Sequence, residues 1–135
     1  MNEMVYSAKR LNPPEVLAKE EYGGFHFYVL NLGTHPCAYV DVTDTFLNGK
    51  EYGSIDIRCH GGWTYSREYL HGIDKKGWFI GWDYAHYNDF AGYELEMPMD
   101  IRTIGKKWTT FEIINECKMV IDQINQITTH TERGG

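Results

Sequence analysis

The sequence predicts an α+β domain, a small antiparallel or mixed β-sheet packed by a long C-terminal helix. Two apolar segments separated by a short turn with glycine and proline predict a β-hairpin in the first third of the chain. A stripe of apolar residues at helical spacing predicts the helix near the end. With 135 residues the chain fits one domain with its own hydrophobic core, so we predict a single domain over 1–135.

The two ends of the chain are expected to be less ordered than its centre. Residues 1–21 are mixed in character, and Pro13-Pro14 interrupts any early helix, so we expect a loosely ordered start with one short helical turn over 15–21. The core is expected over 22–127. The polar tail over 128–135 should be frayed.

The first hairpin is predicted from alternation and from its turn. Residues 25–32 are apolar on both alternating sets, which indicates a strand covered on both faces or nearly so. Residues 33–36 turn the chain, and 37–42 form a second apolar strand. The connection is short, which favours antiparallel pairing.

The middle of the chain supplies the rest of the predicted sheet. Asn48-Gly49 signals a turn in a polar surface excursion. Period-2 alternation over 55–58 predicts a third strand that leads directly into Cys59-His60-Gly61-Gly62. Three further segments follow, an extended piece, a charged turn and an aromatic-rich strand: 63–69, 71–77 and 78–83.

The helix has the clearest start signal in the chain. Thr109 and Glu112 have the spacing of a capping box. The apolar stripe that follows contains Ile114, Cys117, Ile121 and Ile124. Such a stripe can cover one face of the sheet, and it also fits about two heptads, so a dimer seam along the helix is an open alternative.

Composition excludes several function classes. The net charge of −6 argues against a protein that binds long DNA or RNA, which needs a basic stripe. The three cysteines lack C-x-x-C spacing, which is typical of a reduced cytoplasmic setting without a zinc site. We expect no signal peptide, no membrane span, no metal and no cofactor.

The first candidate site follows the predicted third strand. Gly61-Gly62 lacks side chains beside His60, so bare backbone N–H groups could form a nest for an anion. The hydroxyls of Thr64 and Ser66 add donors suited to phosphate or ribose. The structural alternative is a β-bulge, in which the glycines serve only the backbone conformation.

The second candidate site lies at the end of the aromatic strand. Trp78, Phe79, Trp82 or Tyr84 could stack on a base. Asp83 or Asn88 could take ribose hydroxyls or a base edge. Three residues at regular spacing, Asp83, His86 and Asp89, could instead act as acid and base or merely stabilise a turn. Arg58, Arg67 and Arg102 are candidate partners for a phosphate, and Arg102 is assigned to the pocket. No activated nucleophile is recognisable, so no catalytic residue is assigned.

The segments His60-Gly61-Gly62-Trp63-Thr64-Tyr65-Ser66 and 78–83, with His86, Asp89 and the helix over 108–123, resemble a group of small phage and prophage proteins. The likeness covers roughly 22–126. That group usually has a smaller aliphatic residue at the position of Trp63 and phenylalanine or tyrosine at that of Trp82. Within phage proteins of this size, the chain is similar to the Thoeris anti-defence sponges, which sequester cyclic ADP-ribose signals without cleaving them.

The resemblance implies a cytoplasmic protein of the infected bacterial cell that forms a dimer or larger homo-oligomer. It implies that the pocket binds a cyclic ADP-ribose-type nucleotide, such as glycocyclic ADP-ribose, near a subunit interface. Two other functions stay open: a phosphodiesterase or nucleotide hydrolase that uses His60, Asp83, His86 and Asp89, and a direct inhibitor of a host protein.

Overall fold

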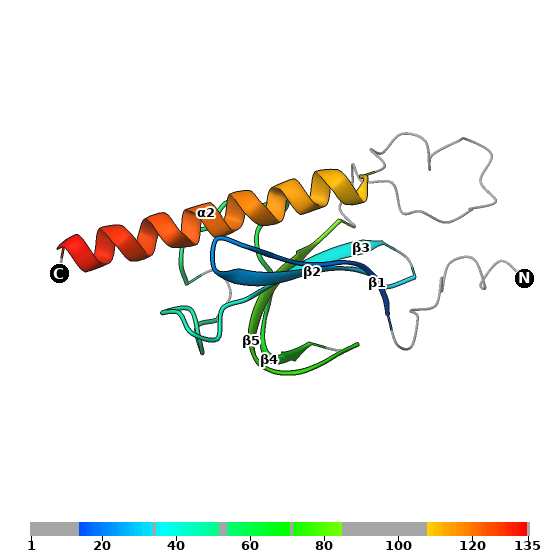
Figure 1. Ribbon diagram of the computed structural model, residues 1–135, viewed down its shortest axis with the longest axis horizontal. Coiled ribbons are helices and arrows are strands. Elements are labelled where there is room, and N and C mark those ends of the chain that lie inside the picture. The colour runs from blue at the N-terminus through cyan, green and yellow to red at the C-terminus, as the bar shows by residue number, and fades with distance from the viewer. Residues whose placement is uncertain (1–13, 34, 52–53, 71, 85–107, 135) are drawn as a thin grey trace, which may run out of the picture.

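The computed structural model describes residues 14–33, 35–51, 54–70, 72–84 and 108–134. Five strands form one antiparallel sheet in the order β1-β2-β3-β5-β4, and the long helix α2 crosses one of its faces (Figure 1). The predicted α+β class is therefore confirmed.

The chain enters the sheet earlier than the sequence predicted. Strand β1 spans Glu15–Tyr22 and pairs with β2, Phe25–Asn31. The expectation of a loosely ordered segment with a helical turn over 15–21 is therefore wrong. Gly23 and Gly24 both have positive φ, +59° and +89°, which is the requirement of a tight two-residue hairpin turn.

Strand β3, Pro36–Asp41, confirms the predicted hairpin with β2. The segment over 55–58 is not a strand, which corrects the prediction. This segment packs beneath α2 instead of joining the sheet, and its Ile57 is buried in the core under the helix. The amide of Gln123, on α2, bonds both the N–H and the C=O of Arg58, at 2.7 Å each.

The last two strands form a bent hairpin. Strand β4 spans Tyr65–Leu70, and β5 spans Ile73–Asp83, so most of the predicted charged turn over 71–77 is strand. The C-terminal half of β5 pairs with both β3 and β4, while its N-terminal half pairs with β4. The hairpin curves below the sheet, on the side away from α2 (Figure 1).

The sheet separates two hydrophobic cores. The larger lies between the sheet and α2, and the smaller lies under the bent hairpin. Alternation along each strand divides the residues, so β2 sends Phe27 and Val29 to the helix side and Tyr28 and Leu30 to the other. This confirms that the strand over 25–32 is covered on both faces.

Helix α2, Thr110–Gly134, begins with the predicted capping box. The N–H of Glu112 donates to Thr109 Oγ1 at 3.1 Å, and the N–H of Thr109 donates to Glu112 Oε1 at 3.0 Å. The helix continues to Gly134 and so includes most of the tail over 128–135, whose fraying stays a prediction.

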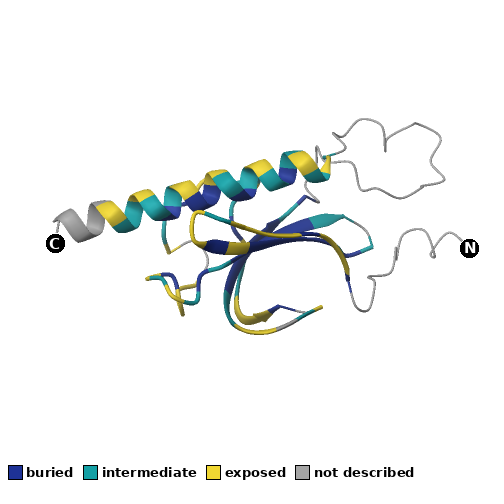
Figure 2. Ribbon diagram, viewed as in Figure 1, coloured by how far each residue is buried: buried dark blue, intermediate teal, exposed yellow. Residues whose placement is uncertain are grey.

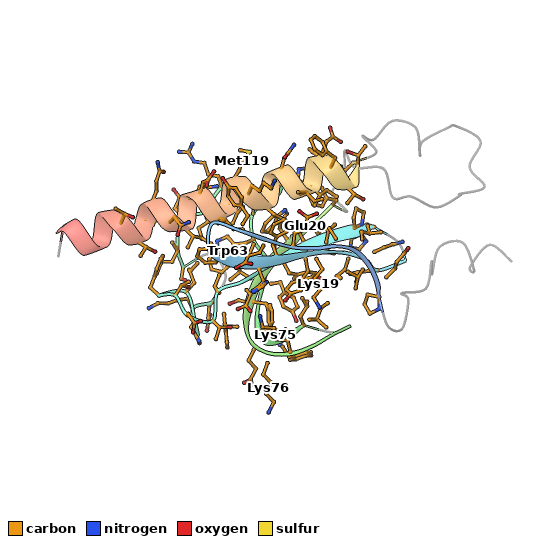
Figure 3. All side chains as sticks on the ribbon, in the orientation of Figure 1. Lys19, Glu20, Trp63, Lys75, Lys76 and Met119 are labelled. Carbon is orange, nitrogen blue, oxygen red and sulfur yellow. The ribbon has the colours of Figure 1, made fainter. Side chains whose placement is uncertain are left out.

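The buried stripe of α2 packs on the protein's own sheet (Figure 2). Cys117, Ile121 and Ile124 are fully buried there, so this stripe is not available as a dimer seam. The opposite side of α2 carries Met119, 62% exposed (Figure 3). Phe111, in the first turn of the helix, is 71% exposed.

Candidate functional site

The Cys59–Gly62 segment forms a tight turn. Gly61 and Gly62 have φ of +70° and +83°, and the N–H of Gly62 donates to the carbonyl of Cys59 at 3.0 Å. Both glycines are thus needed for backbone conformations that other residues rarely adopt. One of the two N–H groups predicted to form an anion nest closes the turn instead, which corrects that interpretation.

The turn places His60 in a cluster of three rings. The imidazole stacks on Tyr84 with centroids 4.7 Å apart and an interplanar angle of 6°. Trp108 lies edge-on to His60 at 4.8 Å and tilted against Tyr84 at 5.1 Å. His60 and Trp108 are half-buried, while Tyr84 is fully buried. The ring cluster of His60, Tyr84 and Trp108 therefore joins the turn, the end of β5 and the residue that precedes the capping box.

A hydrogen-bond relay fixes Tyr84. The indole N–H of Trp82 donates to the Tyr84 hydroxyl at 3.0 Å, and this hydroxyl donates to Glu116 on α2. Burial, and then the hydrogen bond to Glu116, raise the pKa of Tyr84, so the phenol stays protonated. The ring that supports His60 is held by packing and by two hydrogen bonds.

Thr64 and Ser66 have different surroundings. The Thr64 side chain is exposed, and its N–H donates to the carbonyl of Gly81 at 2.9 Å. The Ser66 hydroxyl donates to the carbonyl of Lys50 and accepts from the Trp78 indole N–H at 2.9 Å. Ser66 is therefore used to tie β4 to its neighbours, and the prediction that it offers a donor to phosphate is wrong for this arrangement.

The predicted aromatic residues are not together. Phe79 is 0% exposed and belongs to the core under the hairpin, whereas Trp82 is 1% exposed and belongs to the core under α2. By strand alternation Asp83 lies on the same face of β5 as Phe79, opposite to the face of Trp82 and Tyr84. The structure thus corrects the prediction of one pocket lined by Phe79, Trp82 and Asp83.

Four predicted site residues lie outside the described residues: His86, Asn88, Asp89 and Arg102. Their roles stay predictions. The two residues that flank this stretch of sequence, Tyr84 and Trp108, meet in the ring cluster.

The thiols nearest the turn are poor nucleophiles. Burial, with the nearby charge of Glu116, raises the pKa of Cys59 to about 12. The same causes, burial first, raise the pKa of Cys117. Both cysteines are therefore protonated near neutral pH.

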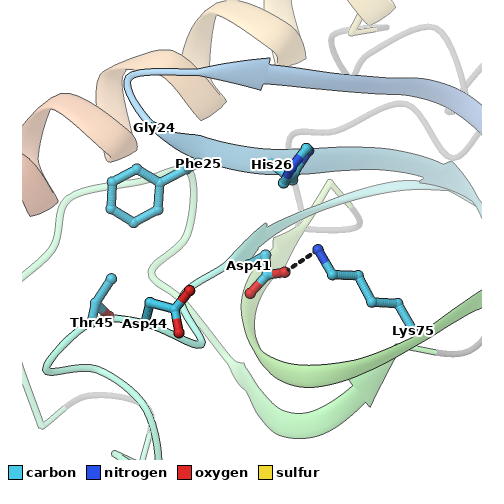
Figure 4. A pocket seen from close by; sticks show the side chains of 7 residues that line it. All are labelled: Gly24, Phe25, His26, Asp41, Asp44, Thr45 and Lys75. Carbon is cyan, nitrogen blue, oxygen red and sulfur yellow. Dashed lines mark ion pairs between the residues drawn. The ribbon is translucent and has the colours of Figure 1, made fainter.

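A hollow of about 360 Å³ lies beside the β1–β2 turn, away from the ring cluster (Figure 4). Its polar wall includes an ion pair between Lys75 and Asp41, 2.6 Å long. Burial alone would raise the pKa of Asp41, but hydrogen bonds from Lys75 and Thr43 outweigh it and lower that pKa. The other lining residues are Gly24, Phe25, His26, Asp44 and Thr45.

The sequence indicates Tyr84 as a stacking ring, but it carries weaker signals for Trp108 and Glu116. Tyr84 continues the alternation of Ile80 and Trp82 onto the helix side, and this signal could have placed it there. Trp108 directly precedes a capping box, and this position indicates only that the ring lies at the start of the helix. Glu116 gave no local signal, because its role depends on a contact 32 residues away in sequence.

Comparison with family models, curated proteins and solved structures finds no match to this chain. Within the described residues, no three histidine, cysteine or acidic side chains are grouped as metal ligands. In the same part of the chain, no helix combines the length and apolar character needed to cross a membrane.

Proposed function

We propose that the protein is a phage anti-defence sponge that holds a cyclic ADP-ribose-type nucleotide without cleaving it, in the cytoplasm of an infected bacterial cell. The observation that carries the proposal is the meeting of His60, Tyr84 and Trp108 at the glycine turn. Half-exposed aromatic rings offer stacking surface to a base, and stacking needs no activated group.

The chemistry of the described residues supports holding over cleavage. The Cys59 thiol is protonated, and the Tyr84 phenol is a donor that is already bonded to Glu116. His60 faces the ring cluster beneath α2, whereas Asp83 lies on the other alternating face of β5. The hydrolase alternative needs these two side chains at one reacting atom, so this arrangement does not favour it.

Capture and release test the proposal. The purified protein is incubated with a cyclic ADP-ribose signal made by an activated TIR-domain enzyme and filtered, and the free nucleotide is assayed before and after heat denaturation. A sponge removes the signal and returns it intact on heating. Loss without recovery would establish cleavage, and no loss would overturn the assignment.

The variants should preserve the fold. Trp82→Ala is unsuitable because this side chain is almost completely buried. His60→Ala and Trp108→Ala remove the half-exposed rings and should weaken capture at least about tenfold. The matched controls are His26→Ala and Phe111→Ala, which remove an exposed histidine and an exposed ring elsewhere and should leave capture unchanged.

The homo-oligomer stays a prediction. Light scattering of the purified protein, with and without nucleotide, measures it directly. The buried stripe of α2 already packs on the protein's own sheet, so any contact through this helix would use its outer side.

A further inference from the structure

Glu116 places a negative charge beside the ring cluster. Its carboxylate accepts the hydrogen bond from Tyr84, and no lysine or arginine among the described residues forms an ion pair with it. Lys118, two residues further along α2, lies over the ring of Tyr22, 5.5 Å from its centroid. The charge of Glu116 is therefore not neutralised by a described basic residue.

The field of this carboxylate reaches the glycine turn. After burial, the charge of Glu116 is the next cause that raises the pKa of Cys59, the residue before His60. The same field acts on any group bound against His60 or Trp108. It opposes a phosphate and attracts a cation.

Aromatic rings beside a carboxylate suit organic cations. A ring face attracts a cation through its quadrupole, and the attraction grows when water is partly excluded. His60 and Trp108 are half-buried, so a group placed against them is partly removed from water.

We propose that this corner receives the base of the nucleotide and selects a positively charged base over a neutral one. The inference rests on the proposed function and extends it to the ligand's chemistry. Adenine acquires a positive charge when its N1 is alkylated. The preferred ligand is therefore a cyclic nucleotide closed through N1 and not the glycocyclic form, whose adenine keeps a free N1 and is neutral. The pyrophosphate of such a ligand would lie away from Glu116.

Two nucleosides provide the test. Adenosine and 1-methyladenosine have the same sugar and nearly the same ring, but the second carries a positive charge at pH 7. Binding of each is followed by NMR titration of the full-length protein. We expect 1-methyladenosine to bind about fivefold more tightly and to shift the signals of His60 and Trp108.

Glu116→Gln keeps an oxygen that can accept from Tyr84 and removes only the charge. This variant should bring the two affinities to within about twofold of each other, while Glu68→Gln, at an exposed carboxylate of β4, should keep the fivefold preference. Thermal unfolding checks that both variants stay folded.

Equal affinities in the unmodified protein, a preference that survives Glu116→Gln, or no binding of 1-methyladenosine at millimolar concentration would each overturn the inference. Capture of the cyclic signal in the filtration assay would then still stand. Failure of capture itself is the separate result that removes the proposed function.

Discussion

On one face of the sheet a separate element, α2, covers Phe27, Val40 and Ile80, whereas the other face is covered by the sheet's own bent β4–β5 hairpin. The helix is fastened at its edges by polar contacts. The Tyr22 hydroxyl donates to Asp122 at 3.0 Å, and the Asn125 amide donates to the carbonyl of Gly23 at 3.1 Å. The helix face therefore combines a large apolar core with specific anchors.

The hairpin face depends on close approach of backbone and rings. Gly81 lies between Tyr39 of β3 and Tyr65 of β4, whose ring centroids are 5.1 Å apart. A Cβ at Gly81 would lie 2.6 Å from the carbonyl oxygen of Ala38 and would also clash with the Tyr39 ring. The helix face is therefore stabilised mainly by the amount of apolar surface that it buries. The hairpin face depends on the absence of a side chain at Gly81.

The largest expected effect comes from truncating a core ring on each face. Phe27 and Phe79 are both fully buried, on the helix and hairpin sides respectively. We expect Phe27→Ala to lower the free energy of unfolding by about 4 kcal/mol and Phe79→Ala by about 3 kcal/mol, because the hairpin can close over a void better than α2 can. Urea denaturation measures both values. A larger loss for Phe79→Ala would break the comparison.

Gly81→Ala tests the close approach on the hairpin face. We expect a loss of about 2 to 3 kcal/mol in the free energy of unfolding, because the neighbouring backbone of Ala38 cannot move aside cheaply. The control is Gly62→Ala, whose Cβ would meet open space and would cost about 1 kcal/mol for its positive φ alone. Equal losses in the two variants would show that crowding at Gly81 is unimportant.

Gln123→Ala tests an anchor of the helix face. The variant loses both hydrogen bonds to the Arg58 backbone. We therefore expect its free energy of unfolding to be lower by about 1 to 2 kcal/mol. Hydrogen exchange at Arg58 should accelerate, since its N–H donates to Gln123. Gln126→Ala, at an exposed position of the same helix, is the control.

The smallest effect is expected at the ion pair between Lys75 and Asp41. The folded pKa of Asp41 lies below its ordinary value of 3.8, so its contribution is present above that pH and is lost as pH falls through the folded pKa. Lys75→Gln should lower stability by about 0.5 to 1 kcal/mol at neutral pH, because the lysine is partly exposed. Thermal unfolding against pH should show this difference vanishing as the pH falls below 3.8 and Asp41 becomes protonated. A stability difference that persists at low pH would show that Lys75 stabilises the protein by packing and not by its charge.

Local sequence signals predicted several elements because each signal acts over a few residues. The capping box of Thr109 and Glu112, the stripe through Ile121 and the hairpin of β2 and β3 all follow from spacing. The Gly23-Gly24 turn was an available signal for β1, since two adjacent glycines suit a tight hairpin. The glycine pair thus signals the hairpin locally, but the expectation of a loosely ordered start gave more weight to Pro13-Pro14.

The sequence by itself determined the α+β class, the start of α2 and the requirement for glycine after His60, because periodicity, capping and glycine conformation are local properties. Tertiary structure decided the partners of the glycine turn at His60. Tyr84 and Trp108 meet His60, and Glu116 meets Tyr84, only when β5 and α2 pack together. The sheet between the two cores separates Phe79 from Trp82. Spacing along the chain cannot specify such contacts, because they depend on which faces of distant elements come together.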